Sequence, residues 1–189
     1  VTDAFAGIPT SLANSDGIWL GSDYHANLTR PGIALYGGAA VSDIPNPMRS
    51  VVTLKARIVQ IRDAKAGETV SYGAAHRLTR ESRLAIVSVG YADGYPRSTS
   101  GAGVPLRAAV PTGAYGFVGE HKVPLVGRVT MDLMCFDVTD VPQEALAGGV
   151  IELIGPNVTV DDVAQAAGTI GYEILTALGA RYQRDVHHG

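Results

Sequence analysis

The sequence has a single cysteine, few charged residues and no long hydrophobic run. Cys135 cannot form a disulfide within the chain, which is typical of a cytoplasmic protein. No apolar run approaches the roughly 20 residues that a membrane helix requires. Only 17% of the 189 residues are charged, and 15 basic and 18 acidic side chains give a net charge of −3. Without a basic excess, the composition argues against a nucleic-acid partner.

The first residues lack an initiator methionine and also lack the basic start and apolar core of a signal peptide. A chain that opens in this way on Val1 is expected to be a processed or excised piece. Its apolar segments before residue 42 would stay exposed unless another polypeptide covered them. The sequence therefore predicts a partner polypeptide or an oligomer.

Glycine and proline, in contrast, are abundant. The 23 glycines and 10 prolines favour many short strands and turns over long helices, and a hydrophobic content of 46% is ample for a packed core. The clearest strand covers 51–62, where Val52, Leu54, Ala56 and Ile58 alternate with polar residues. This spacing of apolar segments predicts a mainly β domain built as a barrel or sandwich. The further strands are expected at 84–89, 104–110, 115–118, 123–129, 133–138 and 150–154.

The composition changes before this β-rich segment. Residues 42–50 contain two prolines and form the best linker candidate, so we expect one unit over 1–45 and a second over 46–189. In the first unit, the short apolar segments at 18–20 and 33–36 are typical of connections between strands and helices.

Two short helices are expected in a helical segment near 161–178. The first covers 161–167 and ends at Gly168, because acidic residues at its start suit the positive end of a helix. The second covers 172–178 and ends at Gly179.

Tyr72, Tyr91 and Tyr172 stand beside glycine and are candidates for function. Glycine lets the backbone turn sharply, so a neighbouring tyrosine can project its hydroxyl away from a sheet. The alternative is a turn aromatic that covers the core with its ring and leaves its hydroxyl in water. Tyr95 belongs to the same run as Tyr91, and the pattern alone leaves both interpretations open.

Arg128 is flanked by apolar residues in PLVGRVTM, which predicts a guanidinium on a strand that needs an acidic partner or an anion. A snorkelling arginine at a sheet edge is the alternative. Cys135, between Met134 and Phe136, is expected to be a buried thiol rather than a nucleophile. The sequence shows no zinc-ligand spacing, phosphate-binding loop or catalytic serine motif, and it predicts no metal site.

Several sequence motifs of this chain occur together in one known family. The segments SYGAAHRLTRESRLAIVSVGYADGYPR and PLVGRVTMDLMCFDVTD, with RPGIALYGG before them and TIGYEILTAL after them, resemble the C-terminal part of alanine racemase, a pyridoxal-phosphate enzyme. The resemblance extends from Asn14 to about Arg184 and keeps the family's order of motifs, which makes it far more specific than any one motif.

The resemblance implies a particular fold. Alanine racemases carry a (β/α)8 barrel, which holds the cofactor on a lysine, followed by a β-rich domain. This sequence resembles only the last βα elements of the barrel, expected over 1–45, and the complete β-rich domain, expected over 46–189. The cofactor lysine is expected upstream, because no matching motif surrounds the lysines of this sequence, which are Lys55, Lys65 and Lys122.

The family's catalytic roles fall on three residues. Tyr72, in VSYG, matches the base that takes the α-proton from L-alanine. The family places this tyrosine opposite the cofactor lysine of the other subunit in a head-to-tail homodimer, so that two bases act on opposite faces of the substrate. Met131, in TMD, matches the residue whose backbone helps to hold the substrate carboxylate. Arg30, in RPGI, matches the arginine that faces the pyridine nitrogen of the cofactor.

The remaining matches concern the cofactor phosphate and the entrance to the site. Ser15, Gly32 and Ile33 match the loops that bind the phosphate through hydroxyl and backbone N–H donors, and Tyr172 matches a second phosphate ligand. The entrance corridor, which would admit a small zwitterion, is matched by Tyr91, Arg97, Arg128 and Ile170.

The resemblance therefore implies a cytoplasmic racemase that interconverts L- and D-alanine with pyridoxal 5′-phosphate and supplies D-alanine for peptidoglycan. The chain alone would need the missing barrel. Two alternatives stay open: a non-catalytic interaction domain derived from the same fold, and a broad-specificity or serine-preferring racemase with the same machinery. An upstream barrel excludes the first, and relative rates on alanine, serine and lysine distinguish the second.

Overall fold

The chain divides into two units, Val1–Val52 and Thr53–Gly189, in the computed structural model. The structure describes residues 2–41, 44–100 and 113–187. The second unit contains the β-rich part of the sequence.

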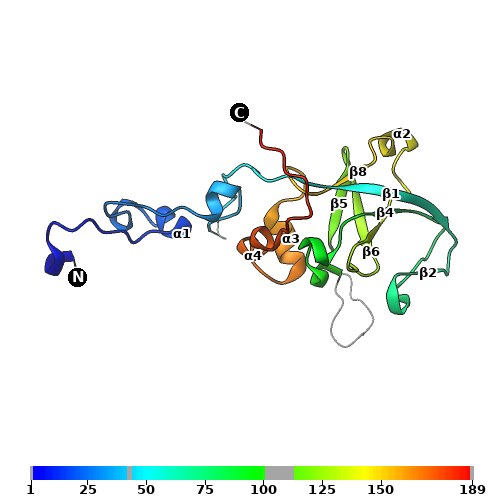
Figure 1. Cartoon of the computed structure of the whole chain (residues 1–189), viewed down its shortest axis with the longest axis horizontal. Coiled ribbons are helices and arrows are strands. Elements are labelled where there is room, and N and C mark those ends of the chain that lie inside the picture. The colour runs from blue at the N-terminus through cyan, green and yellow to red at the C-terminus, as the bar shows by residue number, and fades with distance from the viewer. Residues whose placement is uncertain (1, 42–43, 101–112, 188–189) are drawn as a thin grey trace. The chain divides into compact units, whose positions relative to one another are not determined.

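The second unit is built around a closed antiparallel β-barrel (Figure 1). Its strands follow the order β1-β4-β7-β6-β5-β8, and β1 closes the barrel because it pairs with β4 along one edge and with β8 along the other. The mainly β class that the sequence predicts is confirmed. Among the described residues, the strands are β1 (Leu54–Ala64), β2 (Thr69–Val70), β3 (His76–Arg77), β4 (Ser82–Val87), β5 (Tyr115–Val118), β6 (His121–Val126), β7 (Met134–Asp137) and β8 (Val150–Ile154), with β2 and β3 forming a separate hairpin.

Alternating side chains explain how the strands enclose a core. In β1, Leu54 and Ala56 are buried whereas Lys55 between them faces solvent, as the two-residue period of a strand requires. A register shift between Ile58 and Gln60 marks a bulge, which bends the strand. Beyond this bulge β1 is largely exposed as it continues towards the β2–β3 hairpin.

The core of the barrel is tightly packed. Phe136, Ile151 and Leu153 are fully buried in one apolar cluster. Gly116 in β5 admits this packing, because a Cβ at that position would lie only 2.5 Å from the Ile151 Cγ2 atom. Burial of large apolar side chains therefore supplies most of the stability of this unit.

Cys135 lies between two buried neighbours but is itself only partly buried. Met134 and Phe136 face the core, and the alternation of β7 places Cys135 on the opposite face, against the smaller cluster that contains Leu84 and Val126. The predicted buried thiol is therefore of intermediate exposure. Desolvation nevertheless raises the pKa of the Cys135 thiol, which disfavours a nucleophilic thiolate.

The expected strands at 115–118 and 150–154 are confirmed residue for residue. β1, β4 and β7 differ from their expected bounds by one to three residues. β6 ends at Val126 instead of Val129, because Gly127 adopts a φ of +74° that a strand does not accommodate. The expected strand at 104–110 lies outside the described residues.

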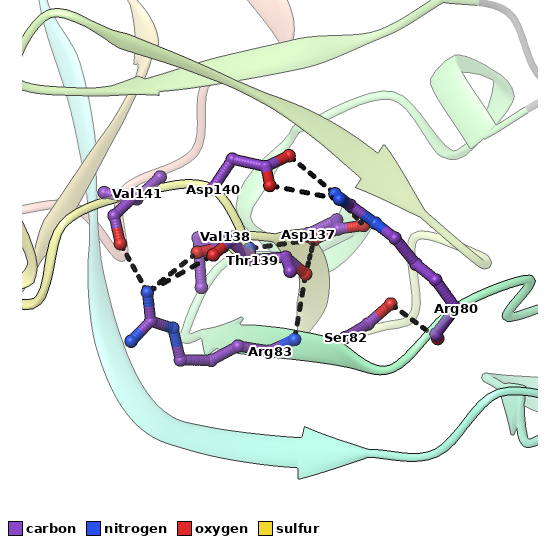
Figure 2. Close-up of polar contacts among 8 residues, drawn as sticks. All are labelled: Arg80, Ser82, Arg83, Asp137, Val138, Thr139, Asp140 and Val141. Atoms are coloured by element: carbon purple, nitrogen blue, oxygen red, sulfur yellow. Dashed lines mark hydrogen bonds and ion pairs between the residues drawn. The ribbon is translucent and has the colours of Figure 1, made fainter.

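A polar cluster ties β4 to the segment that follows β7 (Figure 2). The Arg80 guanidinium makes two hydrogen bonds to the Asp140 carboxylate, at 2.6 and 3.0 Å, and lies 4.0 Å from Asp137. Arg83 donates hydrogen bonds to three backbone carbonyls within 138–141. Arg80 therefore binds side chains of the turn after β7, and Arg83 binds its backbone.

Short helices complete the second unit. α2 (Gln143–Leu146), which the sequence pattern does not predict, precedes β8, while α3 (Val160–Ala167) and α4 (Gly171–Ala177) follow it. The expected stop at Gly168 is confirmed, and α4 begins and ends one residue earlier than expected, with Ala177 as its last residue. In Figure 1, α3 and α4 lie beside the barrel on the side away from β2.

Replacing Thr159 by alanine should lower the free energy of unfolding by about 1 kcal/mol. The Thr159 hydroxyl accepts a hydrogen bond from the Asp162 N–H at 3.1 Å, and the Asp162 carboxylate accepts one from the Thr159 N–H at 2.8 Å. This capping box satisfies donors at the start of α3 that would otherwise lack a partner. Urea unfolding of the full-length protein measures the loss. Thr159→Ser keeps the hydroxyl and serves as the control, so an equal loss in both variants would contradict the capping role.

The first unit contains helical turns and, in its described residues, no strand. α1 (Ser15–Trp19) begins at Asn14, whose side chain accepts a hydrogen bond from the Gly17 N–H at 2.9 Å. The apolar segments at 18–20 and 33–36 therefore fall within or directly after helical turns. The 3₁₀ turns of this unit are Thr2–Phe5, Ser22–Tyr24 and Ile33–Tyr36.

Large apolar side chains of the first unit are exposed to an unusual degree. Residue exposures reach 65% at Val51 and 64% at Leu12 and Leu20. The exposed residues are Phe5, Ile8, Leu12, Trp19, Leu20, Tyr24, Leu28, Leu35, Tyr36, Ile44 and Val51.

None of the helices in the described part of the chain combines the length and the hydrophobicity needed to cross a lipid bilayer.

Candidate active site

Tyr72 lies on the tight turn that joins β2 to β3. The backbone at Ser71 and Ala74 adopts φ values of +72° and +51°, which residues with a side chain rarely take, and Gly73 between them has a φ of +69°. The turn projects Tyr72 into solvent, so that 72% of the residue is exposed. Such unusual backbone conformations clustered around one exposed tyrosine are typical of a functional turn.

Arg128 fastens this turn to the barrel. Its Nε–H donates to the Tyr72 carbonyl at 2.9 Å, and the Ser71 hydroxyl donates to the Arg128 carbonyl at 3.4 Å. Gly127 permits the close approach, because a Cβ there would lie 2.7 Å from the Ser71 Cβ. The predicted strand position of Arg128 is wrong, since β6 ends before it, and its exposure of 3% excludes a snorkelling edge arginine.

Met131 lies in the turn between β6 and β7, against the backbone of the segment that carries Tyr91. The Tyr91 N–H donates to the Thr130 carbonyl and the Ala92 N–H to the Met131 carbonyl, each at 3.0 Å. Gly90 allows this contact, because a Cβ there would lie 2.3 Å from both carbonyl oxygens. Within the described residues, hydrogen bonds engage the carbonyl of Met131 and not its N–H, which leaves that N–H as a donor for a carboxylate.

Asp93 ends the segment of Tyr91 and is buried. Its carboxylate accepts a hydrogen bond from the Gly90 N–H at 2.9 Å and lies 3.2 Å from the Arg181 Nε atom. Arg181 also donates to Asp132 at 2.9 Å. The hydrogen bond to Asp132, followed by the charge of Asp93, raises the pKa of Arg181, so its guanidinium stays charged.

A cleft of about 490 Å³ opens beside this segment. Tyr91 lies on one wall, and Glu173 of α4 lies on another. Tyr172 and Ile170 stand at the start of α4 and are exposed. Arg97, the first residue of a 3₁₀ turn, is partly buried.

Tyr95 is a structural tyrosine beside glycine. It is 2% exposed and belongs to the core, and burial raises its pKa. Tyr72, Tyr91 and Tyr172 differ because each is exposed by 42% or more. The structure thus separates one core tyrosine from three that a ligand can reach.

In the first unit, the residues matched to a phosphate site lie together. Ser15 is fully buried, and its hydroxyl accepts hydrogen bonds from the N–H groups of Gly32 at 2.7 Å and Ala34 at 3.4 Å. Ile33, between these two donors, is also buried. A hydroxyl and neighbouring backbone N–H groups are the donors that a phosphate accepts, and here two such N–H groups donate to the Ser15 hydroxyl.

The other residues relevant to a cofactor site are Arg30 and the lysines. The exposed Arg30 guanidinium is oriented by the Ser11 hydroxyl at 3.0 Å and the Leu12 carbonyl at 3.1 Å. A guanidinium does not readily release a proton, so it fits a pyridine nitrogen that stays unprotonated. All three lysines of the sequence belong to the second unit, and Lys122 stands 3.5 Å from the Tyr115 ring centre. The residues matched to the phosphate and to the ring of the cofactor thus lie in the first unit, whereas no lysine does.

The predicted site residues form separate groups. Tyr72 contacts Arg128, Tyr91 contacts the turn of Met131, and the segment from Arg128 to Met131 connects these two groups. Tyr172 stands at the start of α4, which lies on the other side of the barrel from β2 in Figure 1. The phosphate-site group belongs to the first unit.

Sequence reasoning missed two residues of this site. Asp93 and Arg181 bring together the segment of Tyr91, the turn of Met131 and the chain after α4. The one signal in the sequence was an acidic residue inside the glycine-rich run GYADGY. For Arg181, which lies in a polar C-terminal stretch, the sequence gave no signal of a role in the site.

Across residues 2–41, 44–100 and 113–187, no group of three or more histidine, cysteine, aspartate or glutamate side chains is placed to hold a metal ion. The His25 Nε2 atom instead lies 3.0 Å from the Ile18 carbonyl, in a hydrogen bond within the first unit.

The second unit is thus a closed β-barrel domain whose loops present a strained, exposed tyrosine and, in the described residues, a backbone N–H without a hydrogen bond. The family model for the C-terminal domain of alanine racemase matches residues 51–186. A biosynthetic alanine racemase from Agrobacterium fabrum is 65% identical over 185 residues, which cover 97% of this chain and 47% of that protein. The chain belongs to the alanine racemase family, as its motifs predict.

Solved structures of the family agree with this assignment. The biosynthetic alanine racemase from Pseudomonas aeruginosa matches with a TM-score of 0.86 and 36% identity, covering 99% of this chain and 50% of that one. The alanine racemase from Bartonella henselae, which contains covalently bound pyridoxal phosphate, matches with a TM-score of 0.81 and 40% identity. The match covers 95% of this chain and 47% of that one. The chain spans about half the length of the relatives it matches.

Proposed function

We propose that this chain is the C-terminal half of a racemase that interconverts L- and D-alanine with pyridoxal 5′-phosphate and supplies D-alanine for peptidoglycan in the cytoplasm. The observation that carries the proposal is the exposed Tyr72 on a strained turn that buried Arg128 holds in place. Membership of the alanine racemase family supports the choice of substrate.

Each group of residues has a proposed task. Bound pyridoxal phosphate would act as the electron sink for the charge left at Cα when the α-proton departs. Tyr72 removes that proton from L-alanine and returns one in the reverse direction. The Met131 N–H holds the substrate carboxylate, and Arg30 faces the pyridine nitrogen. The phosphate is held by Ser15, Gly32, Ile33 and Tyr172, and the entrance is formed by Tyr91, Arg97, Arg128 and Ile170.

We also infer that residues 1–45 are the tail of a (β/α)8 barrel and that 46–189 form the β-rich domain. The exposed apolar surface of the first unit supports an upstream barrel segment as its cover. The exposed Tyr72 side chain supports a head-to-tail homodimer in which this tyrosine acts opposite the lysine of the partner's barrel.

Racemisation by the full-length polypeptide, loaded with pyridoxal phosphate, tests this proposal. Rates on L-alanine, L-serine and L-lysine are compared by chiral chromatography, and we expect alanine to be converted fastest. Comparable rates on all three would favour a broad-specificity racemase. Absence of racemisation in a folded, loaded protein would favour the interaction domain.

Replacing Arg128 by lysine in the full-length enzyme should reduce kcat for alanine racemisation about tenfold or more. A lysine lacks the planar fork that reaches the Tyr72 carbonyl, so the turn loses its anchor and the phenol loses its position. Arg83→Lys is a matched control, because Arg83 also binds backbone carbonyls but at the turn after β7 (Figure 2). Equal losses of kcat in both variants would show that the effect is not specific to Tyr72.

A further inference from the structure

We propose that Arg181 is a positioning residue for the substrate carboxylate: it cancels the charge of Asp132 beside Met131 and fixes the Met131 turn through Asp93. The inference rests on the proposed function, because it concerns the same carboxylate that the Met131 N–H would hold.

The geometry places Arg181 between two carboxylates. Its Nε atom lies 3.2 Å from Asp93, and its Nη1 atom donates to Asp132 at 2.9 Å. The Asp93 side chain is only 8% exposed, whereas that of Asp132 is 53% exposed. One guanidinium therefore joins an interior carboxylate to one at the surface, and the latter directly follows Met131 in the chain.

Charge explains why this position needs an arginine. A substrate carboxylate at the Met131 N–H would bind beside the residue that carries the Asp132 carboxylate, and like charges repel each other. Arg181 offsets this repulsion, because its guanidinium remains charged and contacts Asp132 directly. Without Arg181, two uncompensated negative charges, Asp93 and Asp132, would flank the turn.

Backbone contacts extend the effect to the rest of the site. The Asp93 carboxylate accepts the Gly90 N–H, and the Asp93 carbonyl accepts the Gly179 N–H at 2.9 Å. The Tyr91 N–H donates to the Thr130 carbonyl at 3.0 Å, and the Met131 N–H, which lies trans to that carbonyl in the same peptide group, points away from this contact. The Asp93–Arg181 pair thus connects the chain after α4 to the turn that presents the donor.

Steady-state kinetics of the full-length enzyme carrying Arg181→Gln test the proposal. We expect the KM for L-alanine to rise about tenfold while kcat stays within about threefold, because a charge that acts on binding is lost and the proton-transferring groups are kept. Asp132→Asn in the same background should return the KM to within about threefold of the wild-type value, since it removes the uncompensated carboxylate. A merely structural role of Arg181 would not be rescued in this way.

Arg80→Gln is the matched control. Arg80 also bridges two aspartates, at 2.6 Å from Asp140 and 4.0 Å from Asp137, and its side chain is 52% exposed compared with 56% for Arg181. It lies just before β4 and contacts Asp140 in the turn after β7 (Figure 2). We expect Arg80→Gln to leave the KM unchanged.

Asp132→Asn alone keeps the test decisive if Arg181→Gln fails to fold. It retains the Asp93–Arg181 pair and should lower the KM about twofold at low ionic strength, with the difference lost in high salt. An unchanged or raised KM in Asp132→Asn overturns the proposal, as does an unchanged KM in folded Arg181→Gln or a raised KM that Asp132→Asn does not rescue. If the wild-type enzyme does not racemise alanine, the proposed function fails. If it does and the KM does not respond, only this inference fails.

Discussion

Tyr72→Phe in the full-length enzyme should slow alanine racemisation by about 10²- to 10⁴-fold, the usual contribution of a positioned general base. Phenylalanine keeps the ring and removes the hydroxyl that takes the proton. The residue is 72% exposed, and Arg128 anchors the turn through the Tyr72 carbonyl rather than through its hydroxyl, so the fold should tolerate the change. Racemisation of L-alanine, followed by chiral chromatography, measures the loss.

Exchange of the α-proton in deuterated water separates a lost base from a damaged site. The Tyr72→Phe enzyme should fail to exchange the α-proton of L-alanine and should continue to exchange that of D-alanine, because a second base acts on the opposite face. Tyr115→Phe is the control: its ring stays beneath Lys122, and its racemisation rate should be unchanged. A full rate in Tyr72→Phe would refute the assignment of Tyr72 as the base.

The barrel strands were predictable because short apolar segments recur along the chain between separators rich in glycine, proline and aspartate. Tyr115–Val118 and Val150–Ile154 follow this pattern closely, and both were expected at their observed bounds. The end of β6 was not predictable in the same way, because hydropathy continues through Val129 while the backbone turns at Gly127. Conformation at one glycine, rather than hydropathy, ends that strand.

The candidate site was predictable where a motif carries the residue and not where the fold alone brings residues together. Tyr72 and Met131 were identified through sequence motifs that resemble those of the alanine racemase family. Asp93 and Arg181 are far apart in the sequence, and their 3.2 Å contact depends on how the chain after α4 returns to the barrel. The hydrogen bond from Arg128 to the Tyr72 carbonyl could not be predicted either, because a strained turn brings that carbonyl to its guanidinium.

Gly94→Ala should lower the free energy of unfolding by about 4 kcal/mol or more. Single substitutions cause losses of this size only through severe backbone or packing defects. Gly94 has a φ of +96°, and a Cβ there would lie only 1.9 Å from the Ala177 carbonyl oxygen at the end of α4. The alanine variant therefore combines an unfavourable backbone conformation with a clash between two main-chain segments. Urea unfolding of the full-length enzyme measures the loss.

Two further glycines separate the causes of this effect. Gly119 has a φ of +58°, and a Cβ at that position would meet nothing within 4 Å, so Gly119→Ala carries backbone strain alone and should cost about 1 kcal/mol. Gly90 lacks a positive φ, but its Cβ would lie 2.3 Å from two carbonyl oxygens, so Gly90→Ala carries crowding alone and should cost about 3 kcal/mol. Since Gly90 and Gly94 bracket Tyr91, both variants should also impair racemisation, whereas Gly119→Ala should not. A loss in Gly94→Ala no larger than that in Gly119→Ala would show that α4 yields to the added methyl group and does not hold the Tyr91 segment in place.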